Sequence, residues 1–228
     1  MNGAEVHGVL VQKGIDLLYH ANTVTTSLAF LQLGGLASRE RVERDGFRQT
    51  EQYTDNTDKR DGIWNDVFTD TVDIHARIRN ANDYGPVLFV LNAAVLTALP
   101  AQTEIWVTRT NPCKWTAGLQ TCDRYFQTTA QLATGLTKGT FDQIITFRVT
   151  NGVIPFGAYL QDIILDNLRV SHADGEERFI VAQRALRTAA RTGRITTSIT
   201  RRNCGSDCRC HAKYEGDANL VRKNFAVP

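Results

Sequence analysis

The sequence predicts an α+β protein, in which short helices lie between strands without a regular βαβ alternation. Three continuous apolar runs of strand length support this class: PVLFVLN, IITFRVTN and YLQDIILDNLRV. Strands outnumber helices in the predicted pattern. Neither a GxGxxG sequence nor a phosphate-binding P-loop occurs among the 228 residues, so the sequence does not support a Rossmann or P-loop fold.

The N-terminal part is predicted to form a strand, a helix and a loop. The strand is expected over residues 9–19. A threonine at position 25 or 26 can cap the next helix, because its hydroxyl accepts a hydrogen bond from a first-turn amide. Gly34 or Gly35 is expected to end that helix in the left-handed conformation. Residues 40–61 are polar and lack clear periodicity, which indicates a loop over a site.

The middle of the chain is predicted to form a short strand, a short helix and three longer strands. Trp64, Val67 and Phe68 indicate the short strand, and the helix is expected over residues 72–78 after a capping Thr-Asp-Thr sequence. The three apolar runs predict strands over residues 86–92, 144–151 and 159–170. The loop NGVIPFG separates the last two.

Residues 176–228 are predicted to form a basic, cysteine-containing C-terminal extension of a body that covers residues 1–175. Apolar residues follow helical spacing, and four arginines line another side of the same helix: Phe179, Ala182, Leu186, Ala189, with Arg184, Arg187, Arg191, Arg194. From Arg178 to Lys213 there are nine basic residues and one acidic residue, although the whole chain carries only +2. This asymmetry favours a polyanionic partner. A solvated arginine face, or a docking surface for an acidic protein, is the alternative.

The cysteines favour a metal site or free thiols over a disulfide framework, because their number is odd and no secretion signal is recognised. We therefore expect a cytoplasmic protein, and no apolar run is long enough to cross a membrane. Four Cys or His ligands suit structural zinc, which could tie the tail to the body; unlinked reduced thiols are the alternative. The candidate ligands are Cys113, Cys122, Cys204, Cys208, Cys210 and His211.

Three residue pairs lie at the ends or edges of predicted strands: Tyr19-His20, Phe68-Thr69 and Gln161-Asp162. In this order they resemble the mono-ADP-ribosyltransferase superfamily, and within it the DarT-like nucleic-acid-modifying toxins, including mRNA-modifying ones. The resemblance covers about residues 17–166 and rests on LLYHANTVTTSLAFLQLGGLASR, IWNDVFTDTVDIH and YGPVLFVLNAAVL. It implies an ADP-ribosyltransferase-like split β-sandwich with short flanking helices.

The resemblance also implies an activity. Such a toxin would transfer ADP-ribose from NAD onto a base of single-stranded DNA or mRNA, block phage or host growth, and be held in check by a protein antitoxin. An arginine before the middle strand would help to bind NAD, and Arg48 and Arg60 are both available. The residues implied to contact NAD are Tyr19, His20, Thr23, Gly35, Arg48, Arg60, Trp64, Phe68 and Thr69.

The late strand departs from the family pattern, because QDIILD contains no glutamate where the family carries its catalytic one. Cleavage of the nicotinamide–ribose bond passes through an oxocarbenium-like state that a carboxylate stabilises. Asp162 could serve as a shorter carboxylate. Alternatively, Gln161 occupies the glutamate position, natively or through an inactivating change, and keeps the shape without the charge.

The resemblance implies that the loop before this strand selects the target. Phe156 and Tyr159 in this loop could stack on an exposed base, or could instead plug the end of the sheet. Phosphates would be held by Arg184, Arg187, Arg191, Arg194, Arg201 and Arg202. Two other functions fit the same residues. One is an ADP-ribosyltransferase that modifies protein, and the other is a non-enzymatic, zinc-containing nucleic-acid-binding module.

Overall fold

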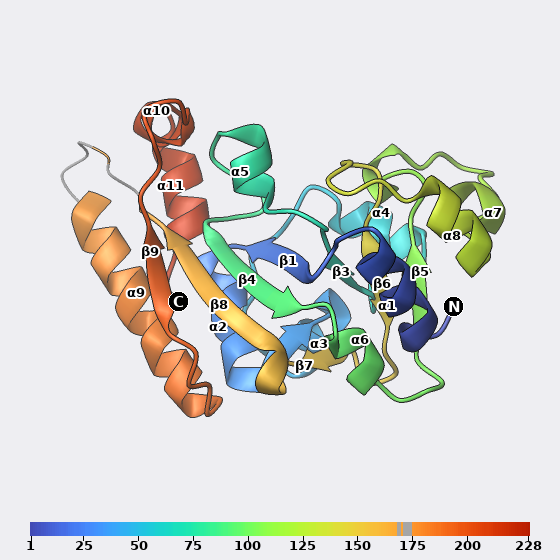
Figure 1. The fold of residues 1–228 in the computed structure, drawn as a ribbon. Helices are drawn as coiled ribbons and strands as arrows, with labels where there is room; N and C mark the ends of the chain where they lie inside the picture. The colour runs from blue at the N-terminus through green and yellow to red at the C-terminus, as the bar shows by residue number, and fades with distance from the viewer. Residues whose placement is uncertain (168–169, 171–174) are drawn as a thin grey trace.

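The computed structural model describes residues 1–167, 170 and 175–228 of the chain, and it confirms the α+β class (Figure 1). The first sheet has the strand order β1 (Leu17–Asn22), β4 (Val87–Asn92), β8 (Leu160–Asp166), β9 (Ile199–Arg202). The second has the order β3 (Val67–Thr69), β6 (Ile145–Arg148), β5 (Glu104–Val107). A small pair consists of β2 (Gly35–Ala37) and β7 (Val153–Pro155). All pairings are antiparallel except that of β8 with β9.

Helices of very different length surround these sheets. In the first half of the chain they are α1 (Gly3–Gln12), α2 (Val24–Leu33), α3 (Arg39–Arg44), α4 (Asp55–Arg60), α5 (Ile74–Ile78), α6 (Val95–Ala98). In the second half they are α7 (Thr121–Arg124), α8 (Thr129–Gly135), α9 (Gly175–Thr192), α10 (Cys210–Gly216), α11 (Ala218–Phe225). Among the described residues α9 is the longest, and it packs along α2.

The two larger sheets meet where β1 lies beside the end of β3. In Figure 1 the strands follow one another across the molecule as β9, β8, β4 and β1, and then as β3, β6 and β5. Backbone hydrogen bonds join the sheets at this point, from Tyr19 N to Asp70 O (2.9 Å) and from Asp70 N to Tyr19 O (2.7 Å). Residues that leave β1 and β3 therefore face one another.

Local sequence explains the elements that were predicted. The run VLFVLN forms β4, a central strand whose first five side chains are buried, as a continuous apolar run requires. Gly34, at φ 70°, ends α2 in the left-handed conformation, as predicted. The N-cap of α2 is Thr23 rather than Thr25 or Thr26, because the Thr23 side chain accepts from the Thr26 amide.

Two predictions near the N-terminus are wrong. Residues 9–19 do not form one strand, since α1 continues to Gln12 and β1 begins only at Leu17. The missed signal is a capping box, in which Asn2 and Glu5 satisfy each other's backbone amides. Residues 40–61 are not a loop throughout, because α3 and α4 lie within or across them. These helices are short and polar, so hydrophobic periodicity does not reveal them.

The basic C-terminal segment packs on the body and completes its first sheet. As the spacing predicted, α9 buries its apolar side chains: Phe179, Ala182, Leu186 and Ala189. β9 then runs parallel to β8, with Ile199 opposite Ile163. The predicted late strand ends at Asp166, and residues 168 and 169 of that prediction lie outside the described residues.

Three phenylalanines form the centre of the core between the first sheet and α2. The ring of Phe89 in β4 lies 5.9 Å from that of Phe30 and is stacked on Phe156 at 5.3 Å, measured between ring centroids. Phe156 is only 2% exposed. Of the two predicted positions of Phe156, stacking on a target base is therefore wrong and packing against the sheet is correct, because its ring is already buried inside the protein. Tyr159, three residues later, is half-buried.

We expect Phe89→Ala to lower the free energy of unfolding by about 3 to 5 kcal/mol, because the cavity would remove both aromatic contacts. Chemical denaturation followed by circular dichroism measures the change. Val11→Ala is the control, since Val11 is 53% exposed and its truncation should cost less than about 0.5 kcal/mol. Equal effects of the two substitutions would contradict the central position of Phe89.

Candidate functional site

A pocket opens where β1 meets β3, and we call it the β1–β3 pocket. Residues 19–22 line one side and residues 66–70 line another, with further residues from α3 and α4. Five of the residues predicted to contact NAD lie in its wall: Tyr19, His20, Trp64, Phe68 and Thr69. The family resemblance implied that these residues converge, and the structure places all five in one pocket wall.

His20 connects the two sides of the pocket. Its Nδ1 lies 2.7 Å from the carbonyl oxygen of Phe68, so Nδ1 carries the proton and donates. Nε2 is then an acceptor, 3.3 Å from the side-chain amide nitrogen of Asn22. Burial, assisted by the charge of Arg39, lowers the pKa of His20 to about 4. The imidazole is therefore neutral at pH 7 and positions β1 against β3.

Arg39, which sequence reasoning missed, is the arginine in the pocket wall. Its Nη2 donates to Asp55 Oδ2 (2.7 Å) and to Thr50 O (3.0 Å). Its Nε and Nη1 are buried and have no hydrogen-bond partner among the described residues. Two unused donors on a buried guanidinium are suited to an anionic oxygen of a ligand. The sequence signal that could have located Arg39 is Ser38, a typical N-cap residue, which shows that a helix begins at Arg39.

The two predicted arginines do not line the pocket. Arg60 is exposed and bonds to Asp61 Oδ2 at 3.1 Å, and Arg48 is absent from the lining. Both were chosen because residues 40–61 were interpreted as a loop over the site. Since α3 and α4 occupy much of this stretch, the position of an arginine in it depends on helix geometry that the prediction lacked.

Thr23 and Gly35, also predicted to contact NAD, have structural positions outside the lining. The Thr23 hydroxyl caps α2 and donates to Thr50 Oγ1 at 2.7 Å. A Cβ on Gly35 would lie 2.3 Å from the carbonyl oxygen of Ile154 in β7, so this close strand contact requires glycine. Both residues stabilise the elements beside the pocket.

The aromatic residues of the wall differ in what their rings can still contact. The Trp64 ring already has Lys59 Nζ at 4.4 Å and the guanidinium carbon of Arg39 at 5.2 Å from its centroid. Phe68 is half-buried and lines the pocket directly. Phe68 is therefore the better surface for a stacked ligand ring, and Trp64 positions Arg39.

The predicted catalytic pair lies outside the β1–β3 pocket. Gln161 is exposed at a bulge in β8, and Asp162 accepts a hydrogen bond from Thr200 Oγ1 at 3.1 Å. β4 stands between β8 and β1 in the sheet, which separates this pair from His20. Among the described residues, the late strand therefore contributes no carboxylate to the lining of this pocket, contrary to the prediction.

Three other carboxylates line the pocket instead. Asp66 pairs with Arg148 at 2.9 Å and Asp70 with Arg77 at 3.2 Å. Asp58, on α4, has no ion-pair partner among the described residues. Burial raises the pKa of Asp58 to about 6, so this carboxylate is mostly ionised at pH 7.

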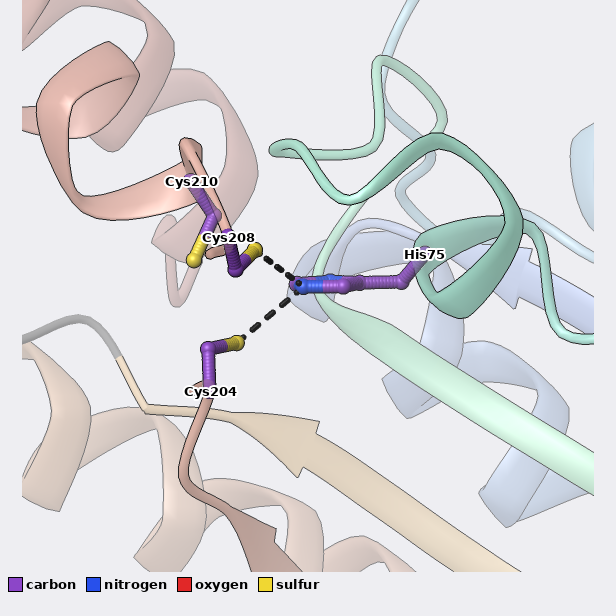
Figure 2. Close-up of side chains that lie close together, drawn as sticks. All are labelled: His75, Cys204, Cys208 and Cys210. Atoms are coloured by element: carbon purple, nitrogen blue, oxygen red, sulfur yellow. Dashed lines mark hydrogen bonds between the residues drawn. The ribbon is translucent and has the colours of Figure 1, made fainter. Parts of the chain in front are cut away.

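A second group of side chains, the Cys–His cluster, consists of His75, Cys204, Cys208 and Cys210 (Figure 2). Their ligand atoms all lie within 4.8 Å of one another, and they could hold a metal ion. His75 Nε2 lies 3.1 Å from Cys204 Sγ and 3.2 Å from Cys208 Sγ. His75 was missed because it lies more than a hundred residues away in the sequence.

The predicted zinc ligands need three corrections. Cys113 and Cys122 are exposed and do not belong to the cluster; Cys113 lines the β1–β3 pocket. His211, next to Cys210 in α10, is not part of the cluster either. Adjacency in sequence suggested it, but His75 from α5 provides the imidazole.

The predicted phosphate-binding arginines separate into two groups. Arg202 pairs with Asp166 and with Asp73, so its guanidinium is committed to two carboxylates, and Arg201 donates to Asn167 Oδ1. Because two carboxylates already occupy its guanidinium, the prediction that Arg202 binds phosphate is wrong. The others lie exposed on or just after α9, at the edge of the molecule away from the β1–β3 pocket (Figure 1): Arg184, Arg187, Arg191 and Arg194.

Comparison with protein-family models found no matching family, and comparison with curated proteins found no significant similarity. Among the described residues, no helix has the length and apolar character that a membrane crossing requires.

The neutral state of His20 predicts a pH-dependent contribution to stability. Because its folded pKa is about 4 and its ordinary value is 6.5, the unfolded chain binds more protons between these values. The stabilisation by His20 is therefore complete above pH 6.5 and is lost as the pH falls towards 4.

Urea unfolding of the wild type and of His20→Asn across this pH range measures the effect. We expect the difference between their free energies of unfolding to shrink as the pH falls, and other titrating groups cancel in that difference. A difference independent of pH would contradict a neutral His20.

Proposed function

We propose that the β1–β3 pocket binds NAD and that the protein transfers ADP-ribose to a nucleic-acid base. The observation that carries the proposal is the pocket wall itself. It combines His20 and Phe68, from segments expected to contact NAD, with two unused donors on Arg39. The joined sheets would then correspond to the split β-sandwich of the ADP-ribosyltransferases.

Each pocket residue has a definable part in this proposal. Arg39 binds the pyrophosphate through Nε and Nη1, and Phe68 stacks on the nicotinamide. His20, neutral and bonded to the carbonyl of Phe68, positions the two sides of the pocket. Asp58 replaces the glutamate that the late strand lacks and stabilises the positive charge that develops on the ribose.

The reaction balances without a further reactant. The bond between the ribose anomeric carbon and nicotinamide breaks, and nicotinamide leaves with the electron pair. A nitrogen or oxygen of the target base forms the new bond to that carbon and releases its proton. Asp58, with its pKa near 6, is a suitable acceptor of that proton at neutral pH.

The remaining parts of the proposal concern partners. The exposed arginines of α9 provide the positive surface for single-stranded DNA or mRNA. A toxin acting in the cytoplasm on nucleic acid requires a protein antitoxin, which the family resemblance implies. The Cys–His cluster takes a structural zinc ion, because four protein ligands leave no open position for substrate.

Calorimetry with NAD tests the binding step. We expect Arg39→Gln to weaken binding about 10- to 100-fold, because hydrogen bonds from a charged donor would be removed. Arg60→Gln is the control, since Arg60 is exposed and outside the pocket lining. Absence of NAD binding by the wild type, with folding confirmed by circular dichroism, would leave the non-enzymatic nucleic-acid-binding module as the better function.

Labelling with radioactive NAD tests the carboxylate. We expect Asp58→Asn to slow labelling of nucleic acid about 100-fold or more, and the wild-type rate to rise with pH through about 6 as Asp58 ionises. Asp162→Asn is the matched control and should label normally. If Gln161→Glu raises labelling and Asp58→Asn changes nothing, the late strand provides the carboxylate. Label on protein alone would identify a protein-modifying enzyme.

Salt dependence tests the nucleic-acid surface. A triple Arg184→Gln, Arg187→Gln, Arg191→Gln variant should bind single-stranded RNA or DNA more weakly. The slope of log affinity against log salt should become shallower by about 1 for each phosphate that the variant no longer neutralises. Arg41→Gln, Arg44→Gln, Arg60→Gln removes the same charge elsewhere and should leave the slope unchanged. Equal slopes in both triple variants would contradict the proposal that the arginines of α9 bind the nucleic acid.

A further inference from the structure

The Cys–His cluster is assembled from two distant parts of the chain. His75 lies in α5, whereas the three cysteines follow β9 in the sequence CGSDCRC. Figure 2 shows the imidazole reaching from α5 towards the sulfur atoms of the C-terminal segment. A bond through this cluster would therefore close a loop of more than a hundred residues.

The donor set and its geometry fit zinc. Three thiolates and one imidazole form a standard structural zinc site, with Zn–S near 2.3 Å and Zn–N near 2.0 Å, so tetrahedral ligand atoms lie about 3.5 to 3.8 Å apart. The four ligand atoms here all lie within 4.8 Å of one another. The two distances from His75 Nε2 to sulfur, 3.1 and 3.2 Å, are slightly shorter than the tetrahedral separation, so small movements of the side chains would place the four atoms around one ion.

A carboxylate outside the cluster holds the imidazole in the orientation that a metal ligand needs. Asp166 Oδ2 lies 2.5 Å from His75 Nδ1, which leaves the lone pair of Nε2 directed at the cysteines. Arg202 in turn donates to Asp166 and to Asp73. Carboxylate–histidine–zinc chains fix metal ligands in this way.

Without a metal, the direct contacts between His75 and the cysteines are weak, although part of the cluster is buried. His75 is 4% exposed and Cys210 is 2% exposed. A thiol is a weak hydrogen-bond donor, so the two S···N contacts contribute little to holding the segments together. The ion pair of Arg79 with Asp207, beside the cysteines, is exposed, and exposed pairs stabilise little.

We propose that one zinc ion, bound by His75, Cys204, Cys208 and Cys210, fastens the C-terminal helices α10 and α11 to α5. This inference is independent of whether the β1–β3 pocket binds NAD. The site is closed and structural, with no coordination position left for a substrate. Zinc binding in such sites contributes directly to folding free energy.

The zinc also has a consequence for the β1–β3 pocket, because α5 serves both sites. α5 has only five residues and is too short to be stable without anchors. Ile74 lines the pocket and the next residue, His75, enters the cluster. On the C-terminal side, α11 packs against α2, and Ala226 O accepts from Thr25 Oγ1 at 2.8 Å.

Zinc analysis of the purified full-length chain tests the proposal. We expect one zinc per chain in the wild type and loss of zinc in Cys208→Ser, with zinc retained in Cys113→Ser and Cys122→Ser. A second pair separates the two histidines, since His75→Ala should release zinc readily to a chelator and His211→Ala should not. Loss of zinc in the control variants to the same extent would overturn the ligand set.

A measurement on the wild type covers the case in which cluster variants fail to fold. Replacement of zinc by cobalt(II) should give the intense visible absorption of a tetrahedral thiolate site. Removal of the metal should lower the melting temperature and speed trypsin cleavage in residues 201–213. A wild-type chain without metal and without cobalt absorption, or with a disulfide among Cys204, Cys208 and Cys210 by mass spectrometry, would overturn the proposal.

Discussion

The hydrogen bond from His20 Nδ1 to the carbonyl of Phe68 is the contact on which the candidate site depends. It joins β1 to β3 beside the backbone bridge between Tyr19 and Asp70, and thereby holds two sheets at one junction. A neutral imidazole can make this bond in a partly buried place without the cost of desolvating a charge. The β1–β3 pocket exists because these two strands are held side by side.

A second polar network surrounds the N-terminal start of α5. Asp166 at the end of β8 bonds to His75 and accepts from Arg202 of β9, and Arg202 also reaches Asp73. The network thus connects two strands of the first sheet with α5. Arg77, on the same helix, pairs with Asp70 beside the pocket. The short helix α5 thus contacts both the polar network and a carboxylate of the β1–β3 pocket.

The parts that sequence reasoning predicted are those fixed by local physics. A continuous apolar run placed β4, a left-handed glycine ended α2, and helical spacing identified the buried face of α9. α3 and α4 were missed because polar helices lack an apolar stripe. Arg39 and Asp58 were missed with them, since their positions in the pocket follow from those helices.

The remaining errors arise because order in the sequence is not order in a sheet. Gln161 and Asp162 were expected beside His20, yet their strand β8 is separated from β1 by β4. His75 shows the converse, because nothing near it in the sequence indicates a metal ligand and only the fold brings it to the cysteines. Charge alone likewise could not distinguish exposed arginines on α9 from Arg202, whose guanidinium is occupied by carboxylates.

A crystal structure of the chain grown with NAD tests the central claim most directly. The account predicts a dinucleotide in the β1–β3 pocket, with a phosphate oxygen on the free donors of Arg39 and the nicotinamide against Phe68. A dinucleotide bound elsewhere, or an empty pocket in crystals saturated with NAD, would contradict it.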